Sequence, residues 1–165
     1  MIVLALDQAT KHTGYSVFDG DMLVRSGVLD VDEELPIYER MNRMRRMITD
    51  LIRQLDPDVL VFEQVQYQSN QKVYSQLSQL QGFVMCVAFD ENLPFYIVEP
   101  VVWKSYAKIH GRKRAEQKAD TVAKAEELFR VGVSEDEADA IFIGYWAANN
   151  IERFYNEGNR NQQNH

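Results

Sequence analysis

The chain lacks the features that mark secreted and membrane proteins. Its single cysteine, Cys86, excludes an intramolecular disulfide, which suits a reducing cytoplasm. No apolar run approaches the roughly 20 residues that a membrane-spanning helix needs. The start, from Met1 to Asp7, has no basic leader and no cleavage motif, so we interpret it as a first strand. We therefore expect a cytoplasmic protein that does not bind membranes, with Cys86 as a small core residue.

Several catalytic and nucleotide-binding motifs are also missing. The glycines are scattered and form neither a P-loop nor a GxGxxG fingerprint. The three histidines, His12, His110 and His165, form no recognisable metal motif. No Ser-His-Asp or Cys-His arrangement stands out. Hydrolysis coupled to a bound nucleotide is therefore poorly supported.

Charge is distributed unevenly along the chain. The formal net charge of −7 argues against nonspecific nucleic-acid binding through the overall field. Residues 101–119 nevertheless contain six basic residues and one acid, a net +5 that leaves −12 on the rest of the chain. Gly111 interrupts this basic segment and indicates a flexible loop. A second basic group is typical of a solvated helix face and consists of Arg40, Arg43, Arg45, Arg46 and Arg53.

The apolar patterns predict one α/β domain over residues 1–155. We expect strands over residues 2–6, 14–18, 22–29, 58–62 and 95–98. We expect helices over 36–55, 70–89, 115–129 and 135–155, with a short helical piece around Trp103. Three strands followed by alternating helices and strands predict a mixed five-stranded sheet flanked by helices. Residues 156–165 are polar and rich in Asn and Gln, which predicts a disordered tail.

Four acidic residues stand where they can converge. Asp7 and Glu63 each end an apolar run, and a strand terminus is where a parallel sheet presents side chains to a ligand. Asp136 and Asp139 share one face at the start of a predicted helix. Taken alone, Asp7, Glu63 and Asp136 could each be a turn residue, a loop residue or a helix-terminal acid. Asp139 is the exception, because it lies among small and apolar residues, where an acid is costly without a counter-charge. Together they predict a carboxylate cluster, which two divalent cations usually neutralise.

Together with other short motifs, these acids resemble those of the RuvC-type Holliday junction resolvases. The similarity rests on Asp7, Thr13-Gly14-Tyr15, Glu63-Gln64-Val65 and the segment Asp136-Glu137-Ala138-Asp139-Ala140. Leu77 to Gly82, Asn92-Leu93-Pro94 and Gln117 also fit the family. The resemblance covers residues 2–148, and the order and spacing of these short motifs make it specific. The compact, divergent chain suggests a phage or mobile-element form.

The resemblance implies an RNase H-like fold and a homodimer that nicks branched DNA. Four-way junctions would be the main substrate, with forks and flaps as further ones, and the products would carry 5′-phosphate and 3′-hydroxyl ends. Mg²⁺, or Mn²⁺ in its place, would bind as two ions per site. The catalytic and metal-binding residues would be Asp7, Glu63, Asp136 and Asp139. Phosphate contacts would come from Lys108, Arg112, Lys113, Arg114 and Lys118.

One position departs from the family pattern. Members often have an aromatic wedge three residues after the glutamate, where this chain has Gln66 and then Tyr67. Either Tyr67 takes over stacking on an opened base, or junction recognition is less selective.

Two other function classes compete with a nuclease. A non-catalytic junction-binding module of the same fold is one, although the presence of all four acids argues against it. An actin- or hexokinase-like phosphotransferase also starts with a strand that ends in Asp before a hairpin. That class needs a longer two-lobed chain and glycine-rich phosphate loops, which the sequence lacks.

The helix expected over residues 70–89 is the proposed dimer interface. Gly82 within it costs about 1 kcal/mol relative to alanine, which close approach of a second backbone can offset. Packing of Gly82 against the chain's own sheet explains the glycine equally well.

Overall fold

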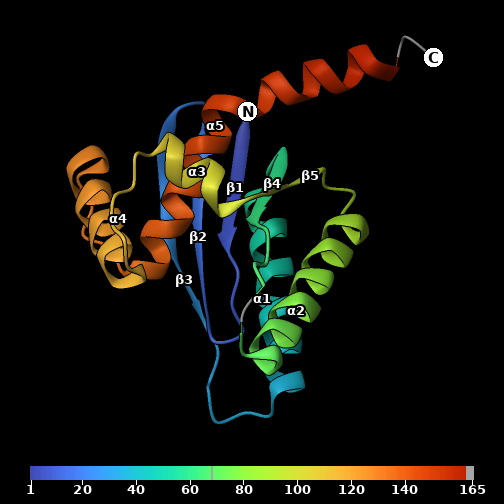
Figure 1. Ribbon diagram of the computed structural model, residues 1–165. Helices are drawn as coiled ribbons and strands as arrows, with labels where there is room; N and C mark the ends of the chain where they lie inside the picture. The colour runs from blue at the N-terminus through green and yellow to red at the C-terminus, as the bar shows by residue number, and fades with distance from the viewer. Residues whose placement is uncertain (68, 163–165) are drawn as a thin grey trace.

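The centre of the molecule is a five-stranded mixed sheet in the order β3-β2-β1-β4-β5 (Figure 1). The computed structural model describes residues 1–67 and 69–162, and side chains as far as Ile151. Strands β1, β2 and β3 form an antiparallel meander, whereas β4 pairs in parallel with β1 and β5 in parallel with β4. Their bounds are Ile2–Asp7, His12–Asp19, Met22–Asp30, Val59–Glu63 and Phe95–Val98. The predicted mixed sheet is confirmed.

Helices cover both faces of this sheet (Figure 1). On one face, α1 (Ile37–Leu55) and α2 (Gln71–Asp90) share an apolar core with Leu4 and Leu6 of β1. On the other, α3 (Pro100–Tyr106), α4 (Arg114–Phe129) and α5 (Glu135–Gln162) share a core with Val3 and Ala5. The two-residue alternation along β1 therefore fills both cores, as expected for a strand buried on both faces.

Local sequence explains the meander and the early start of β2. Gly20 makes the turn between β2 and β3 with a φ of 59°, in the left-handed region that glycine adopts easily. β2 begins at His12, earlier than the predicted residue 14. The Thr13 hydroxyl accounts for this, because it donates to the Ala9 carbonyl at 2.8 Å and accepts from the Ala9 amide at 3.0 Å.

Two further expectations differ from the structure. Cys86 is exposed on α2, so the core position predicted for it is wrong. Its neighbours Val84 and Val87 are the ones that face the core. The backbone of α5 continues to Gln162, into the segment expected to be a disordered tail, because an existing helix extends easily through polar residues. Residues 163–165 of that segment lie outside the described residues. Within the described chain, no helix has the length and apolar character to cross a membrane.

Candidate active site

The four acids predicted from the sequence come from three neighbouring elements. Asp7 is the last residue of β1 and Glu63 the last of β4. Because these strands are adjacent and parallel, their carboxyl ends meet at the same edge of the sheet. Helix α5 packs across β1 and β2 and has Asp136 and Asp139 in its first turns. The fold therefore brings all four carboxylates to one edge.

Gly14 allows α5 to begin so close to the sheet. It pairs with Asp7 across the β1–β2 ladder, and it faces the start of the helix. A Cβ atom on Gly14 would lie 1.9 Å from the backbone oxygen of Asp136, a distance that no side chain can tolerate. The absent side chain thus sets the position of Asp136 relative to Asp7.

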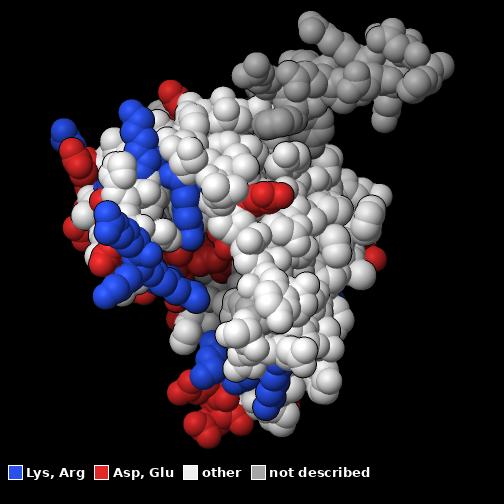
Figure 2. All heavy atoms as spheres, in the orientation of Figure 1, with Lys and Arg blue, Asp and Glu red and all other residues white. Residues whose placement is uncertain are grey.

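All four acids line one cleft of about 610 Å³, which we call the acid cleft. Its wall also includes the polar and basic side chains Gln8, Gln64, Gln66, Lys104, Arg114, Gln117 and Lys118. Figure 2 shows acidic residues at the bottom of a hollow, with Lys and Arg side chains along its border. An acidic floor with a basic rim is suited to a polyanion whose backbone must approach carboxylates.

Two hydrogen bonds hold Glu63 in the acid cleft. The indole Nε1 of the fully buried Trp103 donates to Oε2 of Glu63 at 2.6 Å. The side-chain amide of Gln8 donates to the backbone oxygen of Glu63, also at 2.6 Å. Helix α3 therefore orients the Glu63 carboxylate, and the connection after β1 is tied to the end of β4.

Burial and mutual repulsion perturb the acids. Burial raises the pKa of Asp7 well above its usual value, and the charges of Asp139 and Glu63 raise it further. Burial also raises the pKa of Glu63, against the opposing effect of the Trp103 hydrogen bond. The pKa of Asp139 is raised by burial, although Lys118 opposes the shift. The cluster therefore binds protons or cations more readily than isolated carboxylates do.

Lys118 supplies positive charge within the cluster. Its Nζ lies 3.4 Å from Oδ2 of Asp139 and 3.5 Å from Oδ1 of Asp136. Burial disfavours the ammonium form, but the charges of these two acids and of Asp7 raise the pKa of Lys118 above its usual value. Lys118 is thus a counter-ion of the acids as well as a cleft-lining cation.

The donor chemistry of the acid cleft fits a hard divalent cation, since every acidic ligand offers oxygen. The carboxylates are not yet spaced as a metal site, however. Among the described residues, no group of three or more His, Cys, Asp or Glu side chains is arranged so that it could hold a metal ion. Lys118 in the midst of the carboxylates gives a physical reason, because its ammonium neutralises the acids that such an ion would draw together.

The predicted phosphate-binding residues separate into two groups. Arg114 and Lys118 line the acid cleft, together with Lys104, a residue of the basic segment that was not predicted to contact phosphate. The other three do not line it and are exposed between α3 and α4: Lys108, Arg112 and Lys113. They extend the basic border outward.

Tyr67 lies just beyond the cleft after β4 and is 76% exposed. Its ring contacts that of Tyr74 on α2, with centroids 5.6 Å apart in an edge-on arrangement. The side chain is therefore free on one side to stack against another ring.

Trp103 and Gln8, which both bond to Glu63, were not predicted as residues of this site. Trp103 was noted only as part of a helical piece, and no local pattern links it to Glu63, which is far away in the sequence. Gln8 follows Asp7 directly, and that proximity was the only available signal for it.

Comparison with known proteins points to one family. Residues 3–145 match the family model described as crossover junction endodeoxyribonuclease RuvC. The RuvC of Dictyoglomus turgidum is 26% identical over 147 residues, covering 87% of this chain and 93% of that protein. The RuvC of Petrotoga mobilis is 25% identical over 162 residues, covering 96% of this chain and 99% of that protein.

Solved structures have the same fold. Thermus thermophilus RuvC gives a TM-score of 0.75 at 18% identity, covering 93% of this chain and 97% of that chain. T. thermophilus RuvC in complex with Holliday junction substrate gives 0.73 at 18% identity, covering 90% and 93%. None of these similarities supports a phage origin, which stays a prediction. The family match extends over most of the sequence, and the chain is therefore a member of the RuvC family of crossover junction endodeoxyribonucleases.

Proposed function

We propose that this chain cuts four-way DNA junctions by hydrolysing phosphodiester bonds in the acid cleft, leaving 5′-phosphate and 3′-hydroxyl ends. One observation carries the proposal: carboxylates from β1, β4 and α5 line one cleft with basic side chains in its wall. The choice of substrate is supported by the related T. thermophilus RuvC, whose structure contains a Holliday junction substrate. Forks and flaps are further substrates under the same proposal.

The basic residues would place the DNA. Lys104 and Arg114 border the cleft, where they can hold the phosphates on either side of the one that is cut. The three exposed cations beyond them, Lys108, Arg112 and Lys113, add charge along the path of the duplex arm. Phosphate contacts of this kind set orientation and affinity without reading sequence.

The acids would act on the attacking water. Asp7, Glu63 and Asp139 are partly buried carboxylates with raised pKa values, so each can take up the proton that the water loses. Trp103 keeps Glu63 pointed at the reacting phosphate. The leaving 3′ oxygen gains a proton from solvent, which completes the hydrolysis of one P–O bond.

The metal part of the proposal assigns Mg²⁺, or Mn²⁺ in its place, two ions to a site. The residues that would hold them are Asp7, Glu63, Asp136 and Asp139. Bound divalent cations neutralise charge on the phosphate and lower the pKa of water. The orphaned, buried oxygen of Gln8 and the all-oxygen acid set support this assignment.

Two features would adapt the site to a junction. Tyr67 would stack on a base exposed at the branch point, in place of the wedge residue expected one position earlier. The outer face of α2 would pair two chains, since a two-fold dimer presents two equivalent sites to a two-fold substrate.

The exposed face of α2 supports such pairing. No charged residue lies between Lys72 and Asp90, and Figure 2 shows a broad uncharged area on this side. Phe89 is 70% exposed there. A Cβ atom on Gly82 would meet nothing within 4 Å, so the alternative that Gly82 packs against the chain's own sheet is wrong.

A cleavage assay tests the proposal. A four-way junction and a linear duplex of the same sequence are incubated with the protein in Mg²⁺ and again in EDTA. We expect paired nicks in the junction, in Mg²⁺ only, with ends that a ligase can rejoin. Tight junction binding without any cutting in Mg²⁺ or Mn²⁺ would favour the non-catalytic binding module instead.

A further inference from the structure

Gln8 is a buried glutamine with half of its side-chain amide unused. The residue follows Asp7, lines the acid cleft and is only 8% exposed. Its Nε2 donates to the backbone oxygen of Glu63 at 2.6 Å. Its Oε1 is buried and has no hydrogen-bond partner within the described part of the chain. A buried acceptor without a donor costs free energy unless a ligand supplies one.

The identity of the unpaired atom is fixed by its neighbour. The backbone oxygen of Glu63 can only accept, so the nitrogen of the Gln8 amide must face it and the oxygen must face away. The vacant group is therefore an acceptor. It cannot bind a phosphate oxygen, which is also an acceptor, and it calls for a cation or the O–H of a water molecule.

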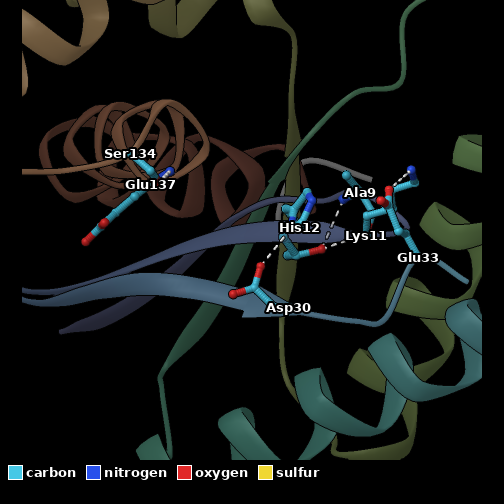
Figure 3. Close-up of polar contacts among 8 residues, drawn as sticks. Ala9, Lys11, His12, Asp30, Glu33, Ser134 and Glu137 are labelled. Carbon is cyan, nitrogen blue, oxygen red and sulfur yellow. Dashed lines mark hydrogen bonds and ion pairs between the residues drawn. The ribbon is translucent and has the colours of Figure 1, made fainter.

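The connection that carries Gln8 is anchored at several points (Figure 3). Ala9 is bonded to the buried Thr13 hydroxyl through both its amide and its carbonyl. Farther along, His12 Nδ1 lies 2.7 Å from Oδ1 of Asp30, and Lys11 pairs with Glu33. These contacts fix the backbone after Gln8, and the bond from Nε2 to the Glu63 carbonyl holds the side-chain amide itself in place.

We propose that Oε1 of Gln8 accepts a hydrogen bond from a water molecule bound to a divalent cation at the Asp7–Glu63 side of the acid cleft. The inference rests on the proposed function, which places a cation there. Mg²⁺ keeps several of its waters and is bound through one or two carboxylates, so its waters need acceptors from the protein. Gln8 joins the strand ends that present Asp7 and Glu63, and it gives the cleft a neutral oxygen besides its acids.

Mn²⁺ binding to the DNA-free protein tests this directly, by electron paramagnetic resonance of the free ion. Gln8→Met keeps the length of the side chain and removes the oxygen together with the Nε2 donor. We expect it to weaken Mn²⁺ binding about 10–100-fold, the usual effect of losing a residue that holds a ligand of the metal. Gln8→Glu keeps an oxygen and loses the Nε2 donor, and we expect it to retain Mn²⁺ binding.

Gln81 offers a matched control. It is also a buried glutamine, 9% exposed, whose Oε1 accepts a hydrogen bond from the Val65 amide at 2.9 Å, and it does not line the cleft. Gln81→Met should lower thermal stability and leave Mn²⁺ binding as in the native chain.

The outcomes separate this inference from the proposed function. If the native protein binds Mn²⁺ and cuts junctions, and Gln8→Met binds Mn²⁺ equally tightly, only the role of Gln8 is overturned. Equal loss of Mn²⁺ binding in Gln8→Met and Gln8→Glu overturns it too, because the Nε2 bond to Glu63 would then be what matters. Native protein that neither binds Mn²⁺ nor cuts overturns the proposed function as well.

Discussion

The indole of Trp103 donates a 2.6 Å hydrogen bond to the carboxylate of Glu63, and the two residues come from different layers of the fold. Burial raises the pKa of Glu63, and this bond lowers it, so Trp103 favours the ionised form. A buried tryptophan in the core under α3 thus controls both the direction and the charge of one acid in the cleft.

Trp103→Phe tests that control. The variant keeps an aromatic ring in the core and removes the donor, so the pKa of Glu63 should rise further. If cutting needs ionised Glu63, activity is lost as pH falls through that pKa, and the variant should lose it at a higher pH than the native chain. We expect single-turnover cutting to fall about 10–100-fold. Trp146→Phe, in the same core, is the control; equal pH profiles for both variants would contradict the role of Trp103.

Ion-free stability should depend on pH through Asp7. The pKa of Asp7 in the folded chain lies well above the ordinary value of 3.8. The contribution of Asp7 to the free energy of unfolding is therefore fully present below pH 3.8. It is lost as the pH rises through the folded pKa. Asp7→Asn removes this loss and should raise the Tm in EDTA at neutral pH, by about 2–4 °C for each kcal/mol regained.

The control for this measurement is Asp50→Asn on the exposed side of α1, which should leave the Tm nearly unchanged. Added Mg²⁺ should stabilise the native chain more than Asp7→Asn. A lower Tm for Asp7→Asn in EDTA would mean that Asp7 is not strained by its neighbours.

Salt dependence tests the basic border. We expect the combined change of Lys108, Arg112, Lys113 and Arg114 to Gln to weaken junction binding and to flatten its dependence on salt. Each lost phosphate contact should reduce the slope of log K against log salt by about 0.9. The matched control changes four arginines of α1 that lie outside the cleft wall: Arg43, Arg45, Arg46 and Arg53. If both variants show the same slope, the basic residues at the border of the cleft do not contact DNA.

Stacking by Tyr67 should be separable from its hydroxyl. Tyr67→Ala should cost roughly 1–3 kcal/mol of junction binding, the range for a base stacked on an aromatic ring, whereas Tyr67→Phe should bind normally. Tyr38 on α1 is similarly exposed, at 69%, so Tyr38→Ala controls for the loss of a surface ring. Normal junction binding and cutting by Tyr67→Ala would remove Tyr67 from the recognition of the branch point.

The assembly proposed through α2 can be tested by light scattering. Leucine at Gly82 meets open space in its own chain and suits a helix better than glycine, so Gly82→Leu should fold normally. We expect the native chain to be a dimer and this variant to be a monomer. Gly132→Leu, at another open glycine outside α2, should stay dimeric. A native chain that is monomeric and still makes paired nicks would refute the dimer. If Gly82→Leu remains dimeric, the interface does not include Gly82.

Much of the fold could be predicted because its signals are local. The apolar runs and the Gly20 turn gave the strands and the meander, and the RNase H-like fold and RuvC family implied by the short motifs are confirmed. The convergence of Asp7 and Glu63 followed from one rule about parallel strand ends. Gly14 could be quoted as part of a motif, but its contact with the backbone of Asp136 could not be foreseen.

The rest depends on contacts between distant segments. The bond from Trp103 to Glu63 and the insertion of Lys118 among the acids depend on how α3 and α4 dock, which no periodicity encodes. The exposure of Cys86 shows the same limit, since an apolar stretch of helix does not reveal which side is covered. Among the six basic residues of the 101–119 segment, only packing separates those in the cleft wall from those beyond it.

The most direct measurement is the cutting of a four-way junction by Asp7→Asn and Asp139→Asn, beside the native chain and Asp50→Asn, with junction affinity measured in EDTA. We expect both cleft variants to bind the junction as tightly as the native chain or more tightly, because less negative charge faces the phosphates. We expect neither variant to cut in Mg²⁺ or Mn²⁺, whereas Asp50→Asn should cut normally. Near-native cutting by Asp7→Asn and Asp139→Asn would contradict the assignment of the acid cleft as the catalytic site.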